Sequence, residues 1–146
     1  MKSVIILCLL IFSTHILSGQ NGKITFFNGT TKNFNEIKET WAGCSTHSGW
    51  LGPNICIEYQ YNGVIIPWKK IKKFEIVTPG GFNDDGCLTN VKVHVMTKSG
   101  IDVEYVQQTL CAFRVVVFNE LTNEYGEQTF SFFHNGKLII KMIEIF

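Results

Sequence analysis

Long apolar runs are missing from this sequence, and so is any excess of charge of one sign. The longest uninterrupted apolar run covers residues 4–12, well short of the ~18 residues that a membrane-spanning helix needs. We therefore expect no membrane span. The chain has 13 Lys and Arg against 12 Asp and Glu, a formal net charge of +1. This balance gives no electrostatic reason to expect nucleic acid as a partner.

Catalytic and metal-binding signatures are also missing. A nucleophilic site needs Ser or Cys beside a base that a third group orients, and beyond residue 20 the only histidines are His47, His94 and His134. We expect His94, in a strand, and His134, beside a turn, to face solvent. Cys44 and His47 have the spacing of a zinc-binding pair, but no second close pair accompanies them. We expect neither a cofactor nor a metal, and the residues carry no motif of a known family.

The N-terminal residues have the layout of a secretory signal peptide. Lys2 precedes the apolar run, and Gly19 is a small residue suited to the last position before cleavage. We predict a signal peptide over residues 1–19 and a protein that is secreted or lies in the periplasm or cell envelope. Cleavage would remove Lys2 and leave 12 basic and 12 acidic side chains.

Four cysteines remain after this cleavage, namely Cys44, Cys56, Cys87 and Cys111. An even number in an exported chain of this size predicts two disulfides, with three possible connectivities. We expect Cys44–Cys56 and Cys87–Cys111, because each would close a short loop within its own half and let that half fold separately. The rival pairing, Cys44–Cys111 with Cys56–Cys87, would join the halves.

Two similar hairpins are the clearest structural signals in the sequence. In residues 55–66, apolar and polar side chains alternate as in a half-buried strand, and Asn62-Gly63 suits the positive φ angles of a type I′ turn. Residues 129–140 repeat this layout around Asn135-Gly136. We predict a β-hairpin at each place. Pro67 should interrupt the sheet with a bend or a single 3₁₀ turn.

Further strands are predicted on both sides of these hairpins. Residues 23–27 form a short strand before the turn residues Asn28-Gly29, and residues 91–96 and 101–106 alternate strictly around a Gly-containing turn. Residues 113–118 are apolar enough for a buried strand.

The segments 33–42 and 103–112 are ambiguous between strand and helix. Phe34, Ile37 and Trp41 have the spacing of one helix face. For the first segment we expect a returning strand that passes into a helical turn.

The whole pattern predicts a mainly β fold of two related β-hairpin-based halves, packed as a small barrel or sandwich with at most short helical turns. Residues 20–146 would form a single mature domain. Its halves, 20–78 and 88–146, would be joined by a Gly-, Pro- and Asp-rich connection at 79–87. At an offset of 69 residues, residues 23–26 lie over residues 92–95, and residues 141–146 match residues 72–77 if residues 67–70 are an insertion.

A local cluster of basic residues lies just after the first of the two hairpins, consisting of Lys69, Lys70, Lys72 and Lys73. We expect it to be a solvated sheet edge that discourages association between sheets, rather than a phosphate-binding surface.

Residues 43–54 are rich in Gly and Ser and have no periodicity, which predicts a loop. Loops on a rigid scaffold are where binding residues concentrate. We therefore predict binding residues here, with Trp50 first, His47 second, and Ser48 beside them. The alternative for Trp50 is that its ring folds back and caps the open end of the sheet.

Together these features favour a binding function over catalysis. The sequence predicts an exported, disulfide-stabilised extracellular or cell-envelope interaction module, with a protein or glycan partner that it does not identify. One alternative is a secreted hydrolase that uses His47 with Asp84 or Asp85, although these two aspartates are expected in an Asx-type turn. The other is an inhibitor of a secreted enzyme that inserts loop 43–54 into its partner.

Overall fold

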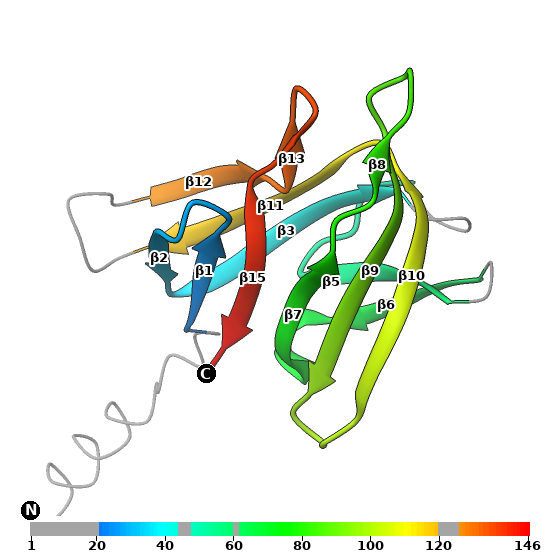
Figure 1. Ribbon diagram of the computed structural model, residues 1–146. Coiled ribbons are helices and arrows are strands. Elements are labelled where there is room, and N and C mark those ends of the chain that lie inside the picture. Colours follow the sequence, from blue (N-terminus) through cyan, green and yellow to red (C-terminus); the bar gives the residue numbers. More distant parts are fainter. Residues whose placement is uncertain (1–20, 44–47, 60–61, 120–125) are drawn as a thin grey trace, which may run out of the picture.

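A computed structural model describes residues 21–43, 48–59, 62–119 and 126–146 (Figure 1). All strand pairs in these ranges are antiparallel, and one 3₁₀ helix, η2 (Trp68–Lys70), is the only helical element there. The predicted mainly β fold is confirmed. The described sheets do not close into a barrel, and their packing is sandwich-like.

The larger sheet, sheet A, has the strand order β10-β9-β7-β15-β1-β2, with β8 paired to β9. Its strands are β1 (Gly22–Phe26), β2 (Thr31–Phe34), β7 (Ile71–Thr78), β8 (Gly81–Phe82), β9 (Leu88–Thr97), β10 (Asp102–Leu110) and β15 (Ile140–Ile145).

The smaller sheet, sheet B, has the order β12-β11-β3-β4. Its strands are β3 (Glu36–Gly43), β4 (Ser48–Trp50), β11 (Phe113–Asn119) and β12 (Gly126–Ser131). Two separate hairpins complete the fold, β5 (Asn54–Tyr59) with β6 (Asn62–Pro67) and β13 (Phe133–His134) with β14 (Lys137–Leu138).

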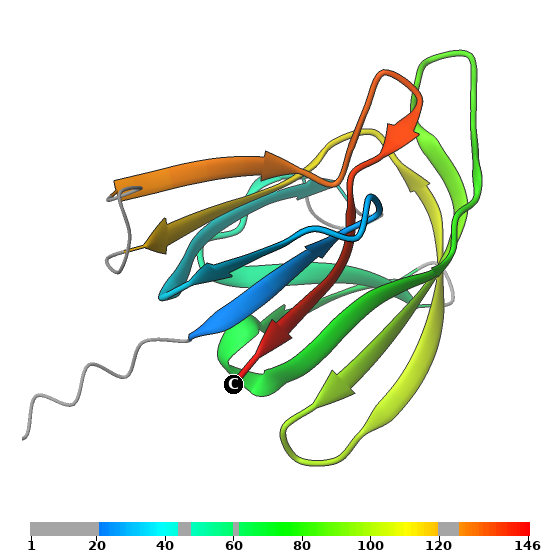
Figure 2. The ribbon, with the colours of Figure 1, turned by 60° about the vertical axis from the view of Figure 1, so that its left-hand side comes forward.

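Figure 2 shows the two sheets facing each other, and the buried side chains of both form one hydrophobic core. Aromatic rings gather at its centre, where Phe74 of β7 lies 5.9 Å from Phe113 of β11 and 5.7 Å from Phe132, measured between ring centroids. Trp68 of η2 is fully buried, and its indole nitrogen donates a 2.7 Å hydrogen bond to the hydroxyl oxygen of Thr40 in β3. These aromatic rings therefore fill the space between the sheets.

The two Asn-Gly hairpins have different turns. Asn135 and Gly136 both have positive φ, at 47° and 70°, and form the predicted turn between β13 and β14. The hairpin is shorter than predicted, because residues 129–131 lie in β12 of sheet B and Ile140 lies in β15 of sheet A. Asn62 instead pairs with Tyr59, and Gly63 pairs with Glu58. The hairpin exists, but the prediction that Asn62-Gly63 forms its turn is wrong, because pairing has already begun at these residues.

Segment 33–42 contains parts of two strands and no helical turn, so the predicted helical turn is wrong. A bend at Asn35 separates β2 from β3, and this lets Phe34 and Ile37 both face the core despite their odd spacing. Trp41 lies in strand β3, so it is not part of a helix face. The second ambiguous segment, 103–112, also begins as a strand, because β10 runs to Leu110.

The remaining strand predictions for the second half are confirmed. Strands β9 and β10 form the predicted hairpin, with Gly100 at φ 93° in its turn. Strand β11 is largely buried. The 3₁₀ turn predicted after Pro67 is η2.

The lysine cluster is not at a sheet edge. Lys72 and Lys73 lie in β7, which pairs with β15 on one side and β9 on the other, near the middle of sheet A. The predicted role of discouraging edge-to-edge association is therefore wrong, although Lys69, Lys70 and Lys72 are solvent-exposed.

Both sheets combine strands from the two halves of the sequence. If β1, β2, β3, β4 and β7 are equated with β9, β10, β11, β12 and β15, each strand order reads the same from either end. At the centre of sheet A, Phe74 pairs with Ile143, 69 residues further along. This separation equals the offset found in the sequence.

A disulfide joins Cys87 to Cys111, as predicted, and this excludes the rival connectivity. Cys56 is also disulfide-bonded, but its partner lies outside the described residues, so the Cys44–Cys56 pair stays a prediction. Residues 1–20, with the predicted signal peptide and cleavage site, also lie outside them, so the signal peptide stays a prediction. In the described part of the chain, no helix is long and apolar enough to span a membrane.

Candidate binding surface

The segment predicted to be a loop, residues 43–54, contains a strand. Strand β4 pairs with β3 at the edge of sheet B, with Ser48 opposite Gly43, Gly49 opposite Ala42, and Trp50 opposite Trp41. The backbone at Ser48 is therefore part of the sheet, and His47 lies outside the described residues. The prediction of a loop is wrong for residues 48–50.

Trp50 packs against a second indole. Its ring lies 5.3 Å from that of Trp41 at an interplanar angle of 80°, an edge-to-face contact. Trp50 is 50% exposed. The ring is thus neither detached from the sheet nor a buried cap, and half of its surface is available to a partner.

The aromatic pair continues as a row across the outer face of sheet B. Trp41 in β3 is opposite Arg114 in β11, and Arg114 is opposite Ser131 in β12. Directly opposed residues on neighbouring strands point to the same side of a sheet. Trp50, Trp41, Arg114 and Ser131 therefore share one face, and we call these four residues the outer row.

Arg114 is the only arginine in the chain and is solvent-exposed. No described carboxylate forms an ion pair with it. Its neighbours along the strand, Phe113 and Val115, are buried in the core. The burial of these two neighbours fixes the backbone at Arg114. The guanidinium group of Arg114, on the exposed face, is available to an external acceptor.

A polar pocket of about 270 Å³ adjoins the row at Arg114 and Ser131. Its other walls come from the β13–β14 hairpin, chiefly His134, Asn135 and Gly136, and from the disulfide region at Cys111 and Gly86. Hydroxyl, amide, imidazole and guanidinium groups therefore converge beside the aromatic pair.

Part of the pocket wall comes from two projecting loops, the β8–β9 connection and the β13–β14 hairpin. Figures 1 and 2 show these two loops side by side. Phe82 at the base of one loop lies 5.8 Å from Phe133 of the other, between ring centroids. The Cys87–Cys111 disulfide fastens the first loop to the segment that leads into β11. The pocket is therefore built on a cross-linked frame.

Of the residues in the hydrolase alternative, Asp84 and Asp85 lie within the described ranges. Asp84 and Asp85 are exposed in a tight turn in which the side-chain oxygen of Asn83 accepts hydrogen bonds from the amides of Asp85 and Cys87. This is the Asx-type turn that the sequence predicted. Their relation to His47 stays untested, because His47 lies outside the described ranges.

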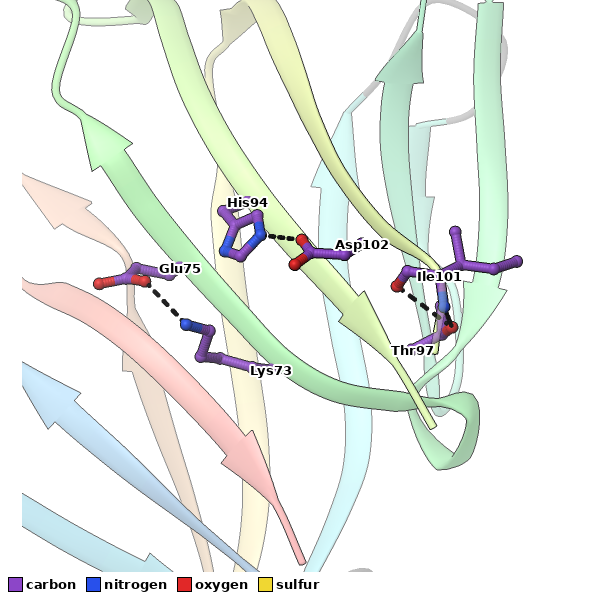
Figure 3. A network of polar contacts seen from close by, with 6 residues as sticks. All are labelled: Lys73, Glu75, His94, Thr97, Ile101 and Asp102. Atoms are coloured by element: carbon purple, nitrogen blue, oxygen red, sulfur yellow. Dashed lines mark hydrogen bonds and ion pairs between the residues drawn. The ribbon is translucent and has the colours of Figure 1, made fainter. Parts of the chain in front are cut away.

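The two other histidines have separate surroundings. The imidazole of His94 in β9 contacts the side-chain carboxylate of Asp102 in β10 on the outer face of sheet A, as Figure 3 shows. His134 is exposed, as predicted, and lines the polar pocket. Within the ranges that the structure describes, no group of three or more His, Cys, Asp or Glu side chains is arranged to hold a metal ion.

Sequence reasoning found Trp50 but missed the rest of the row. The spacing of Trp41 in the sequence suggests a helix face, and Arg114 lies in a segment whose apolar residues predict a buried strand. A signal was available at Arg114, since one charged residue stands inside the apolar run Phe113-Arg114-Val115. The cross-strand register that joins these residues is not visible in the sequence.

Comparisons with protein-family models, with curated proteins and with solved structures gave no match.

Proposed function

We propose that this protein is an exported carbohydrate-binding module that holds its ligand on the outer row and in the adjoining polar pocket. The observation that carries the proposal is the alignment of Trp50 and Trp41 with Arg114, across three neighbouring strands. A pyranose ring has an apolar C–H face and a rim of hydroxyl groups. It therefore suits a surface that changes from aromatic to polar within a few ångströms.

The chemistry of the pocket supports an acidic sugar in particular. A guanidinium group binds a carboxylate through two parallel hydrogen bonds, and Arg114 has no described ion-pair partner that would compete. Ser131 and Asn135 supply further donors and acceptors for hydroxyl groups. We infer that uronic acid or another carboxylated sugar is preferred over a neutral one.

An extracellular or cell-envelope location supports the same proposal. The Cys87–Cys111 disulfide fits an oxidising compartment, and the predicted signal peptide would deliver the chain there. Surface polysaccharides and glycoproteins are the partners available in that location.

The test is binding of the mature protein, residues 20–146, to an array of neutral and acidic oligosaccharides, followed by calorimetry on the best ligand. We expect Trp50→Ala to abolish measurable binding. Because Trp50 is half exposed, its replacement should lower the free energy of unfolding by only about 1 kcal/mol, the scale of one aromatic pair. Arg114→Gln should reduce the preference for acidic over neutral sugars.

Ile101→Ala is the matched control, because Ile101 is an exposed apolar residue, 57% accessible, in the turn between β9 and β10. It should bind like the wild type. A Trp50→Ala protein that keeps full affinity, or one that loses about 3–5 kcal/mol of stability as a core residue would, contradicts the proposal.

A further inference from the structure

A second concave site lies on sheet A, away from the outer row. It is a groove of about 500 Å³ lined by seven residues, Lys72, Lys73, Met96, Lys98, Glu144, Ile145 and Phe146. These residues come from the neighbouring strands β9, β7 and β15 and from the adjoining turn and C-terminal residue. The volume is within the range of small-molecule sites in proteins.

The register explains why these side chains meet. Lys73 pairs with Met96 on one side and with Glu144 on the other, so the three point to the same face of the sheet. The turn that carries Lys98 is held in place by a 2.8 Å hydrogen bond from its backbone nitrogen to the carbonyl oxygen of Lys70. The groove is therefore supported by paired strands and a tethered turn.

Apolar groups form part of the lining. Met96 is partly exposed and Phe146 is 71% exposed, whereas the side chain of Ile145 is buried in the core and closes the groove from beneath. An exposed aromatic ring next to a hydrophobic depression is a surface that gains free energy when an apolar ligand covers it.

Charges around the groove divide into paired and unpaired groups. Lys73 forms a 3.3 Å ion pair with Glu75, drawn in Figure 3, and Glu144 lies 3.2 Å from Lys23, so both lining charges already have a partner of opposite sign. Lys72 and Lys98 are exposed and form no ion pair with any residue of the described ranges. Two uncompensated ammonium groups thus stand beside an apolar surface.

We propose that this groove binds a free single-chain anionic amphiphile, a fatty carboxylate, with its chain on Met96 and Phe146 and its carboxylate between Lys72 and Lys98. The charge of the rim selects an anion, and the apolar lining selects a ligand with a hydrocarbon body. Zero net charge over the mature chain does not oppose this, because exposed charges beyond about 10 Å are screened at 0.1 M salt. The site is independent of the carbohydrate surface on sheet B.

Calorimetry with three probes tests the proposal, namely decanoate below its micellar concentration, decanol and acetate. We expect decanoate to bind, acetate to show no binding, and decanol to bind about 10-fold more weakly, because it lacks the charge-assisted contacts. Equal affinity for decanoate and decanol, or no decanoate binding, would overturn the proposal.

Two charge-matched double variants separate the rim from general electrostatics. Lys72→Gln with Lys98→Gln should weaken decanoate binding about 10-fold and leave decanol binding unchanged. Lys137→Gln with Lys141→Gln removes the same charge from exposed positions that do not line the groove and should bind decanoate like the wild type. An equal loss of decanoate affinity in both double variants would contradict binding at this groove.

Phe146→Ala provides the apolar arm, since Phe146 is mostly exposed and its removal should not unfold the chain. It should weaken decanoate and decanol to the same degree. Vesicles of anionic phospholipid are the competing occupant. If the protein binds these vesicles but not free decanoate, the groove is a membrane contact and the proposal is wrong.

Discussion

Trp68 shows how one buried polar contact connects a short helix to a sheet. Its indole is fully buried, and Thr40 is the hydroxyl that accepts its hydrogen bond across a sequence separation of 28 residues. A buried donor left without an acceptor costs more than a typical hydrogen bond contributes, because the desolvated group then has no partner.

We therefore expect Trp68→Phe and Thr40→Val each to lower the free energy of unfolding by about 1–3 kcal/mol or more, since each leaves one buried polar atom unpaired. The double variant should lose less than the sum of the two single changes. Urea unfolding of the four proteins measures this coupling. Strictly additive losses would mean that the hydrogen bond contributes nothing beyond packing.

Strand β1 depends on a glycine for its fit between its two neighbours. At Gly22, an added Cβ would overlap the carbonyl oxygen of Glu144 in β15 and the buried ring of Phe34 in β2. These atoms belong to β15 and β2, the two strands that flank β1, so an added side chain would disturb both strand pairings.

Gly22→Ala should accordingly destabilise the protein by about 1–3 kcal/mol, the usual range for overpacking in a core. Lys23→Ala, one residue further along, removes a partly exposed ion pair with Glu144 and should destabilise the protein less than Gly22→Ala does. Thermal unfolding of the two variants side by side makes the comparison. Equal losses would show that β1 can move away from β2.

Elements were predictable from the sequence where a local rule decides the conformation. Asn135-Gly136 forms the predicted turn because its two residues must both have positive φ. Asn62-Gly63 carries the same dipeptide, yet pairing with Tyr59 and Glu58 places it inside the hairpin. The Asn62-Gly63 dipeptide therefore predicts the hairpin correctly but predicts the wrong strand register.

The candidate site was less predictable because it depends on contacts between distant residues. The sequence indicates Trp50 by its residue type, and its 50% exposure is compatible with a contact role. Its neighbours Trp41 and Arg114 are brought beside it by two strand pairings, and Arg114 is 64 residues away in sequence. Such long-range register has no local signature.

At the scale of the whole molecule, the reversible strand order supports a chain of two related halves. We propose that residues 20–78 and 88–146 are structural repeats about an approximate two-fold axis through the Phe74–Ile143 pair. The halves are not side by side as separate units, because β7 pairs with β15 in sheet A and β3 pairs with β11 in sheet B.

This arrangement predicts that neither half folds alone, contrary to the expectation drawn from the cysteine spacing. Expressed separately, residues 20–86 and 87–146 should each expose a central strand of both sheets and remain unfolded by far-UV circular dichroism. The intact domain should unfold in a single transition. A fragment with a cooperative melting curve of its own would show that a half is an independent domain.

The position of β15 also constrains when the protein can fold. Ile143 pairs with Ile24, 119 residues earlier in the chain, and β15 stands between β1 and β7. A ribosome that has released β1 through β10 has therefore supplied only two separate parts of sheet A, and they cannot be joined until residues 140–145 emerge. Closing so long a loop is slow, which favours a chain that stays unfolded during synthesis and completes its fold only afterwards.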